Sequence, residues 1–157
     1  MSVAVPAAGS IAPTQGLCSM QVFKLWLIVV AVFVTADLVW LGVIMKDFYS
    51  HELGELARRA GGRLSPRWGP ALAVYVLIPT GLVLFVRPLL APSAGVSQAL
   101  GWGALFGLVL YGVYDLTNLA VLDRWTIRMT AADMVWGAVL CGAISVVMCL
   151  SQRWLAS

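Results

Sequence analysis

Four long apolar stretches constrain this chain more than any other feature. A helix that crosses the hydrocarbon core of a bilayer needs about 20 apolar residues. Hydrophobic residues make up 61% of the 157 residues and charged residues only 11%, against about 45–50% and about 25% in soluble domains. We therefore expect an all-α integral membrane protein, an antiparallel bundle of four transmembrane helices over residues 25–45, 68–90, 99–122 and 130–151.

The composition also excludes several classes of protein. So few charged side chains cannot cover a soluble enzyme, and a net charge of +3 forms no basic patch for DNA or RNA. The three cysteines form no CxxC pair, and His51 is the single histidine. A His/Cys zinc site or a bis-histidine haem is therefore not expected. We predict no metal, no cofactor and no nucleic-acid partner.

The chain is predicted to consist of a disordered tail, residues 1–20, and one transmembrane domain, residues 21–157. The first 23 residues carry no charge and are rich in Ala, Pro, Gly and Ser. They lack the basic segment that begins a signal peptide. Met20 is an alternative translation start.

Basic residues indicate how the bundle is oriented. The loops at 46–67 and 123–129 carry seven Lys and Arg residues, whereas the opposite side carries only Lys24, Arg87 and Arg153. The positive-inside rule then places those two loops in the cytoplasm and both termini in the periplasm. The first of these loops has apolar residues at helical spacing, from Tyr49 to Ala60, and ends at Gly61-Gly62. This pattern predicts a short amphipathic helix at the membrane surface, either a lid or a helix attracted to anionic lipid.

Three aspartates lie inside the predicted spans, where each charge costs at least about 2.5–3.5 kcal/mol at mid-membrane. Asp37 lies roughly 12 Å and Asp115 roughly 10 Å from the cytoplasmic end of its helix, at 1.5 Å per residue. Asp133 lies three residues into the fourth span from the same side. All three carboxyl groups are therefore expected at one depth, in the cytoplasmic leaflet.

Aromatic and amide side chains share helix faces with these aspartates. Asp37 and Trp40, like Asp133 and Trp136, are three residues apart, so an indole lies one turn from each carboxylate. A stripe along the third span becomes more polar toward the cytoplasm, as the floor of a pocket would. The residues expected to complete a ligand or proton site are Tyr75, Tyr111, Tyr114, Thr117 and Asn118, and those expected to let helices approach closely are Gly103, Gly107 and Gly137.

A purely structural interpretation remains open. The aspartates could be protonated and hydrogen-bonded to Asn118, Thr117, Tyr75 or Tyr111, serving only to fix the packing of the helices. Polar contacts between membrane helices stabilise by only about 0.6 kcal/mol on average. This is little stabilisation compared with the cost of burying three acids. Ionisable residues inside a membrane therefore favour a functional site.

Several of these segments are similar to a known family. They are Asp37-Leu38-Val39-Trp40-Leu41, Tyr114-Asp115-Leu116-Thr117-Asn118, and Asp133 with Trp136 and Gly137. Over residues 20–150 the sequence resembles the bacterial inner-membrane family of domain of unknown function 2177. The resemblance implies a compact four-helix unit in the bacterial inner membrane, and it implies no particular reaction.

Three functions are compatible with these residues. Carboxylates beside indole and phenol rings suit the binding or transport of a small cationic or protonated molecule. An accessory subunit of a larger membrane complex is the second hypothesis, and a lipid-modifying enzyme with Asp115 and Asp133 as acid and base is the third. The sequence has no catalytic nucleophile paired with a base and no phosphate-binding loop, which favours a non-enzyme. The partners left open are membrane lipid, a second copy in a homodimer and a larger membrane complex.

Overall fold

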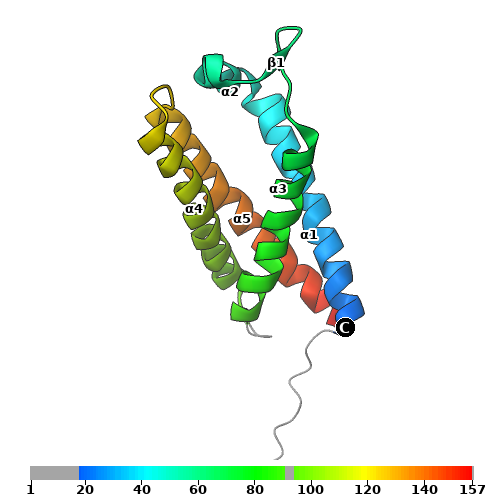
Figure 1. Ribbon diagram of the computed structural model, residues 1–157. Coiled ribbons are helices and arrows are strands. Elements are labelled where there is room, and N and C mark those ends of the chain that lie inside the picture. Colours follow the sequence, from blue (N-terminus) through cyan, green and yellow to red (C-terminus); the bar gives the residue numbers. More distant parts are fainter. Residues whose placement is uncertain (1–17, 91–93, 157) are drawn as a thin grey trace, which may run out of the picture.

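The computed structural model describes residues 18–90 and 94–156, and it confirms an all-helical membrane protein with four long apolar helices (Figure 1). The first helix is α1 with a π-helical turn, η1, and the second is α3 followed by the π turn η3 and the 3-10 turn η4. At 1.5 Å per residue each is long enough to cross a hydrocarbon core of about 30 Å. Their bounds are α1 Ser19–Val39, η1 Trp40–Ile44, α3 Trp68–Gly81, η3 Leu82–Val86, η4 Arg87–Leu89, α4 Val96–Val121 and α5 Ile127–Ala156.

The first helix begins earlier than the apolar pattern alone indicates. Ser19 and Met20, assigned above to the tail, belong to α1. Gln21 explains this start, because its side-chain oxygen accepts a hydrogen bond of 2.8 Å from the backbone N–H of Cys18. Its amide nitrogen donates to the carbonyl oxygen of Leu155, also at 2.8 Å, which joins the start of α1 to the end of α5. The predicted disorder of residues 1–17 lies outside the described residues.

The predicted surface helix is present but shorter than expected. It comprises α2, Lys46–Leu53, and the 3-10 turn η2, Gly54–Leu56. The prediction that it continues to Ala60 is wrong. Gly54 has φ +46°, a backbone conformation that ends the α-helix.

A two-stranded hairpin takes the place of the last expected helical turn. Its strands are β1, Arg59–Ala60, and β2, Arg63–Leu64, and they pair antiparallel. Gly61 and Gly62 have φ of +57° and +77°, which suits a tight hairpin turn with positive φ at both central residues. The Gly-Gly pair therefore forms a turn between strands rather than a helix end.

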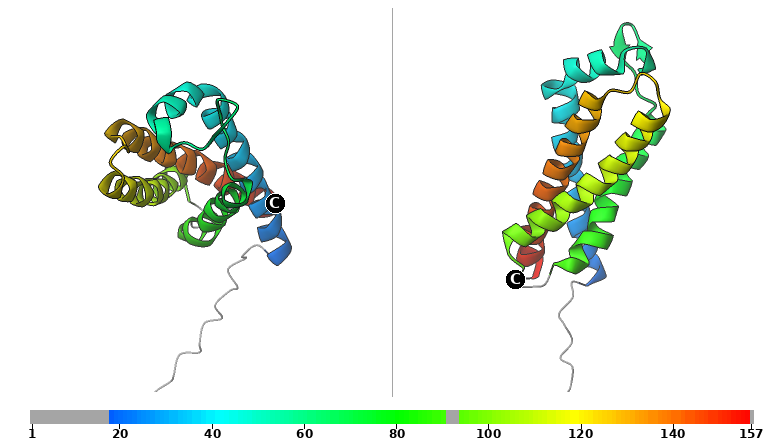
Figure 2. Two further views of the ribbon diagram at one scale, coloured as in Figure 1. Left: turned by 45° about the horizontal axis from the view of Figure 1, so that its top comes forward. Right: turned by 90° about the vertical axis from the view of Figure 1, so that its left-hand side faces the viewer.

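The helices pack as two pairs that diverge toward α2. The α4–α5 pair is the tightest contact, whereas α1 packs on both α5 and α3. The pairs come together away from α2, where Gly81 at the end of α3 lies against the ring of Phe106 and η3 packs on α4. Figures 1 and 2 show α2 and the hairpin at one end of the bundle, with the start of α1 and the end of α5 at the other.

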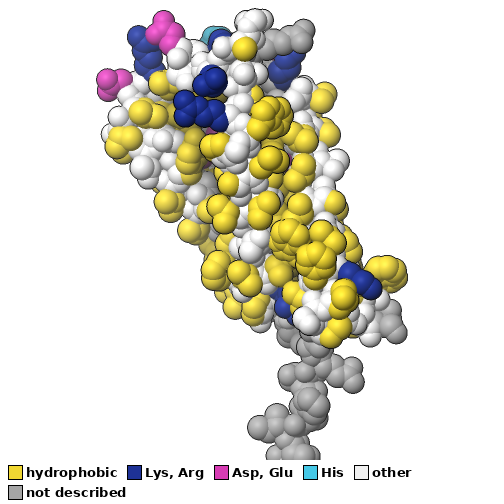
Figure 3. Space-filling view, turned by 45° about the vertical axis from the view of Figure 1, so that its right-hand side comes forward, with side chains coloured by type: hydrophobic (Ala, Val, Ile, Leu, Met, Phe, Trp, Pro, Cys, Tyr) yellow, Lys and Arg dark blue, Asp and Glu magenta, His cyan; other side chains and the backbone are white. Residues whose placement is uncertain are grey.

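The outer surface of the helices is apolar. Leucine, valine and phenylalanine side chains on α1, α3 and α4 are exposed along the bundle, and the charged side chains gather mainly at the α2 end (Figure 3). An apolar surface of this extent is unstable in water and suits contact with lipid. The interior between the helices is apolar as well, away from the α2 end, and is built from residues that include Leu25, Val29, Phe33, Leu82, Val86, Leu140, Ile144 and Met148.

Candidate functional site

Three aspartates from three helices meet near the α2 end of the bundle. Asp37 lies near the end of α1, Asp115 near the end of α4 and Asp133 near the start of α5. Asp37 and Asp133 line one cavity of about 480 Å³. The carboxyl group of Asp115 lies behind that of Asp133, within hydrogen-bonding reach of it. The two antiparallel pairs of helices thus bring the acids together from positions far apart in the sequence.

The carboxylate of Asp37 is held by side chains from two other helices. The indole Nε1 of Trp136 donates a hydrogen bond of 3.0 Å to Asp37 Oδ1. The hydroxyl of Tyr75, on α3, is also within hydrogen-bonding reach of this carboxylate. Trp136 in turn stacks on Trp40, with ring centroids 4.1 Å apart and planes inclined by 3°. Trp40 begins the π turn η1, and π turns are frequent at functional sites.

Tyr49 connects Trp40 to Asp133 through two hydrogen bonds. Trp40 Nε1 donates to the Tyr49 hydroxyl at 3.4 Å, and this hydroxyl donates to Asp133 Oδ1. Burial raises the pKa of Tyr49, and the hydrogen bond to Asp133 raises that pKa further. Tyr49 therefore keeps its proton and remains a donor. Each Asp-x-x-Trp segment is thus hydrogen-bonded to the other one. Trp136 donates directly to Asp37, whereas Trp40 is connected to Asp133 through the Tyr49 hydroxyl.

The short helix α2 covers one end of the cavity and is held there by side-chain contacts with the rest of the bundle. Besides Tyr49, it presents Glu52, whose Oε2 accepts a hydrogen bond of 2.5 Å from the Thr126 hydroxyl. This bond lowers the pKa of Glu52. In the next turn, η2, Glu55 forms an ion pair with Arg124. Because Arg124 and Thr126 lie between α4 and α5, these contacts join the first loop to the last.

Asp115 is the least satisfied polar residue of the site. Its side chain is 0% exposed, and neither carboxylate oxygen has a hydrogen-bond donor among the described residues. Another acid, Asp133, lies within hydrogen-bonding reach of it. Two carboxyl groups at this separation can form a hydrogen bond only when a proton lies between them. The pair can therefore share one proton.

Tyr111 and Tyr114 form the α4 wall of the cavity. Tyr111 lies over Gly137, where a Cβ atom would collide with its ring. Tyr114 is 60% exposed, and its ring meets that of Trp125 edge-on at 5.8 Å. One phenol is thus packed inside the bundle and the other stands at the edge of the cavity.

Glycines allow α4 and α5 to approach closely beside the site. A Cβ atom at Gly103 would collide with Ser145 and with the carbonyl oxygen of Cys141. A Cβ atom at Gly107 would collide with the carbonyl group of Gly137. Backbone contact of this kind is typical of small-residue interfaces in membranes, and it sets the position of Asp115 relative to Asp133.

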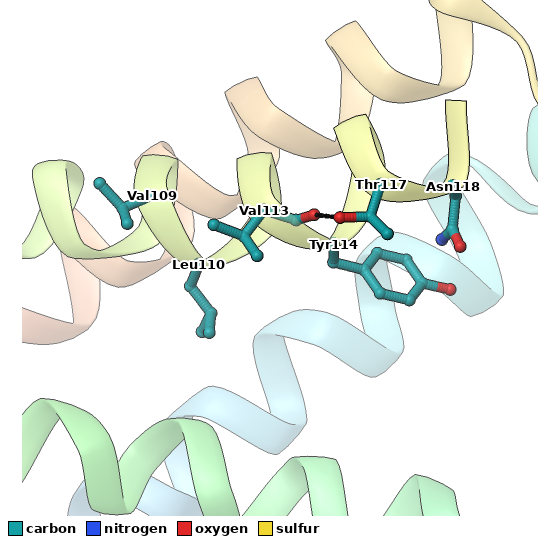
Figure 4. Close-up of a pocket in the computed structure, with 6 residues that line it drawn as sticks. All are labelled: Val109, Leu110, Val113, Tyr114, Thr117 and Asn118. Carbon is teal, nitrogen blue, oxygen red and sulfur yellow. Dashed lines mark hydrogen bonds between the residues drawn. The ribbon is translucent and has the colours of Figure 1, made fainter. Parts of the chain in front are cut away.

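Thr117 and Asn118 lie apart from the carboxylates. The Thr117 hydroxyl donates to the carbonyl oxygen of Val113 at 2.6 Å, within its own helix (Figure 4). The Asn118 side chain is within hydrogen-bonding reach of the Tyr114 hydroxyl. Both residues line a shallow groove on α4 that shares Leu110 and Tyr114 with the cavity.

No basic side chain in the described part of the chain forms an ion pair with the three aspartates. Among residues 18–90 and 94–156, the ion pairs are His51–Glu52 and Arg124–Glu55, both outside the cavity. Within the same residues no group of three or more His, Cys, Asp and Glu side chains is arranged to hold a metal ion. The cavity therefore presents acidic and aromatic groups without a counter-charge from the described part of the chain.

Sequence reasoning missed Tyr49 and the apolar wall of the cavity. Tyr49 was expected only as one of the apolar residues at helical spacing in the surface helix, yet it is 7% exposed and hydrogen-bonded to Asp133. Its signal was an aromatic residue nine positions after Trp40, just beyond a span that already carried an acid and an indole. The apolar wall, from Leu41, Val74, Leu77, Ile78 and Leu110, left no sequence signal, because these residues look like any other membrane-facing side chains.

Comparison with known proteins places the chain in a family. No curated protein and no solved structure matches the sequence. Residues 22–150 match the family described as predicted membrane protein DUF2177. This match includes most of the first and last helices, the whole of the other two and every residue of the site, from Asp37 to Trp136. The chain is therefore a multi-pass membrane protein that belongs to the DUF2177 family.

Proposed function

We propose that this protein binds, and moves across or within the membrane, a small organic cation or protonated amine held in the cavity beside Asp37 and Asp133. The observation that carries the proposal is that both carboxylates face one cavity without a basic partner among the described residues. A bound cation would supply the missing counter-charge. The cavity volume of about 480 Å³ lies within the range of small-molecule sites.

Aromatic rings supply the second element of cation recognition. Trp136 and Tyr111 line the same cavity as the two carboxylates. The faces of such rings attract a cation by about 0.5–2 kcal/mol, more when water is excluded. The Trp40–Trp136 stack and its hydrogen bond to Asp37 hold one of these rings in place before a ligand arrives, which reduces the cost of ordering on binding.

The experiment compares two ions of the same shape and opposite charge. Tetraphenylphosphonium and tetraphenylborate are offered to the purified protein in a neutral detergent, and binding is measured by equilibrium dialysis. We expect the cation to bind and the anion not to bind. We expect Asp133→Asn and Asp37→Asn each to weaken cation binding at least tenfold, about 1.4 kcal/mol.

The matched control is Asp123→Asn, which removes an exposed acid between α4 and α5. It has the same change in net charge, and it is expected to leave binding unchanged. Equal binding of both ions, or unchanged affinity in both site variants, would overturn the proposal.

We also propose that the protein lies in the bacterial inner membrane with its α2 end in the cytoplasm. Seven of the ten Lys and Arg residues belong to the segments at that end, and the positive-inside rule supports this orientation. An alkaline phosphatase fused after Ser157 should then be active, because that enzyme needs the periplasm. An inactive phosphatase with an active cytoplasmic reporter at the same position would reverse the orientation.

A further inference from the structure

The cavity is open on the side that faces lipid. Five of its lining residues are exposed on the outer surface of the bundle. Val74 is exposed by 48% and Leu77 by 66% on α3, Leu110 by 37% and Tyr114 by 60% on α4, and Leu41 by 39% in η1. All five lie within the membrane-spanning helices, and the four on α3 and α4 flank one opening. The α2 end is covered by Tyr49, which is only 7% exposed. A ligand therefore reaches the carboxylates most directly from the bilayer, between α3 and α4.

The divergence of the two helix pairs produces this opening. Away from α2, Gly81 and η3 close the space between α3 and α4. Toward α2 the ribbons of α3 and α4 separate (Figure 1), and Leu110 and Tyr114 project from α4 on the side of α1 and α3 (Figure 4). The opening thus lies at the depth of the aspartates and narrows toward the other membrane surface.

An apolar groove continues from the opening along the outside of the bundle. It has a volume of about 320 Å³ and runs between α4 and the turns η3 and η4. Leu110 lines both this groove and the cavity. From Tyr114 to Trp102, at the far end of the groove, α4 rises roughly 18 Å. That length is close to the roughly 15 Å of hydrocarbon in one leaflet. The groove is lined by Phe85, Val86, Leu89, Trp102, Leu105, Phe106, Val109 and Leu110.

The acidic cavity and the apolar groove together define one kind of ligand. Resting on the function proposed above, we propose that the ligand is a membrane-dissolved amphiphile whose amine or quaternary ammonium head enters between α3 and α4 while its alkyl chain lies in the groove. The head pairs with Asp37 and Asp133, and the chain displaces bilayer lipid from the apolar residues of α4 and η3. A phosphate in the head would face two carboxylates, and no described residue that lines the cavity is a lysine or arginine to bind it.

The test separates the chain from the head. The protein is placed in nanodiscs of phosphatidylcholine, and displacement of tetraphenylphosphonium is measured with tetramethylammonium, octyltrimethylammonium and dodecyltrimethylammonium. Concentrations are expressed per lipid, so that partition into the bilayer does not count as binding. We expect dodecyltrimethylammonium to bind at least tenfold more tightly than the octyl compound. A dodecyltrimethylammonium with a diazirine in its chain should label Leu105 or Phe106 on α4.

A pair of substitutions on α3 tests the route of entry. Leu77→Trp fills the opening, and Leu72→Trp adds the same ring at an exposed position of α3 outside the cavity. We expect the first to weaken dodecyltrimethylammonium binding at least fivefold and the second to leave it unchanged, with both variants eluting as the parent does in size exclusion. One outcome would overturn this inference and leave the proposed function standing. In that outcome tetraphenylphosphonium binding still depends on Asp133, but the alkylammonium compounds bind equally whatever their chain length and Leu77→Trp has no effect. Loss of all cation binding would overturn the proposed function as well.

Discussion

Asp115→Asn should stabilise this protein, which is unusual for a change to a buried polar residue. Asp115 is 0% exposed, and both of its oxygens lack donors among the described residues. A buried polar group without a partner costs about 1–3 kcal/mol. Asparagine has nearly the same shape and carries two N–H donors, so it can donate to Asp133 without an added proton. We therefore expect the free energy of unfolding to rise by about 1–3 kcal/mol at pH 8.

The assay is thermal unfolding in a mild neutral detergent, followed by tryptophan emission. For a chain of this length the expected stabilisation corresponds to a rise in Tm of roughly 2–12 °C. The advantage should shrink at pH 5. A proton between Asp115 and Asp133 then supplies in the parent the hydrogen bond that asparagine supplies at any pH. Since the folded pair gains from this proton and the separated carboxyls of the unfolded chain do not, acid stabilises the parent relative to the variant.

The control and the refuting result are specific. Asp123→Asn makes the same substitution at an exposed position, and its Tm should stay within about 2 °C of the parent, as expected of a surface change. If Asp115→Asn lowers the Tm at pH 8, and the difference does not change with pH, then a group outside the described contacts satisfies Asp115. The inference that this aspartate shares only a proton with Asp133 would then be wrong.

Two further predictions concern the framework of the site. Gly107→Ala should destabilise the α4–α5 contact by about 1–3 kcal/mol, measured as a lower Tm, because its Cβ would collide with the carbonyl of Gly137; Gly101→Ala, with open space around its Cβ, should not. Thr126→Val should raise the pKa of Glu52 toward its ordinary value, because the Thr126 hydroxyl lowers it. This hydrogen bond contributes its full stabilisation at pH values above the ordinary pKa of glutamate. The stabilisation is lost as the pH falls through the lowered pKa of Glu52. A carboxyl-carbon NMR titration in which the pKa of Glu52 does not move would contradict this account.

The helices were predictable from sequence because a bilayer imposes a simple requirement. Each span must place about 20 residues in hydrocarbon. This requirement fixes the number of long elements and their helical type without knowledge of how they pack. The ends were less predictable, since they depend on individual contacts such as the hydrogen bonds of Gln21 to Cys18 and Leu155. The hairpin after α2 was missed for a related reason. Gly61-Gly62 is compatible with a helix end or a tight turn, and Gly54 ends the helix earlier through its positive φ.

The acidic residues of the site could be predicted from the sequence, whereas the hydrogen bonds between its side chains were harder to predict. A charged residue inside a span is a signal at any position, so Asp37, Asp115 and Asp133 stand out without a structure. Whether an indole serves its own aspartate or one on another helix depends on how helices pack. The i, i+3 spacing predicts that Trp136 lies near Asp133, yet its N–H bonds Asp37.

If the proposed cation draws Asp37 toward itself, we expect the hydrogen bond from Trp136 to Asp37 Oδ1 to lengthen. Trp136 is stacked on Trp40, and Trp40 donates to the Tyr49 hydroxyl that holds Asp133. We expect movement at one carboxylate to reach the other through the paired rings, and α2 through Tyr49. Since α2 is also hydrogen-bonded to the loop before α5 through Glu52 and Thr126, we expect occupancy of the cavity to affect the position of α2. In the orientation proposed above, α2 faces the cytoplasm.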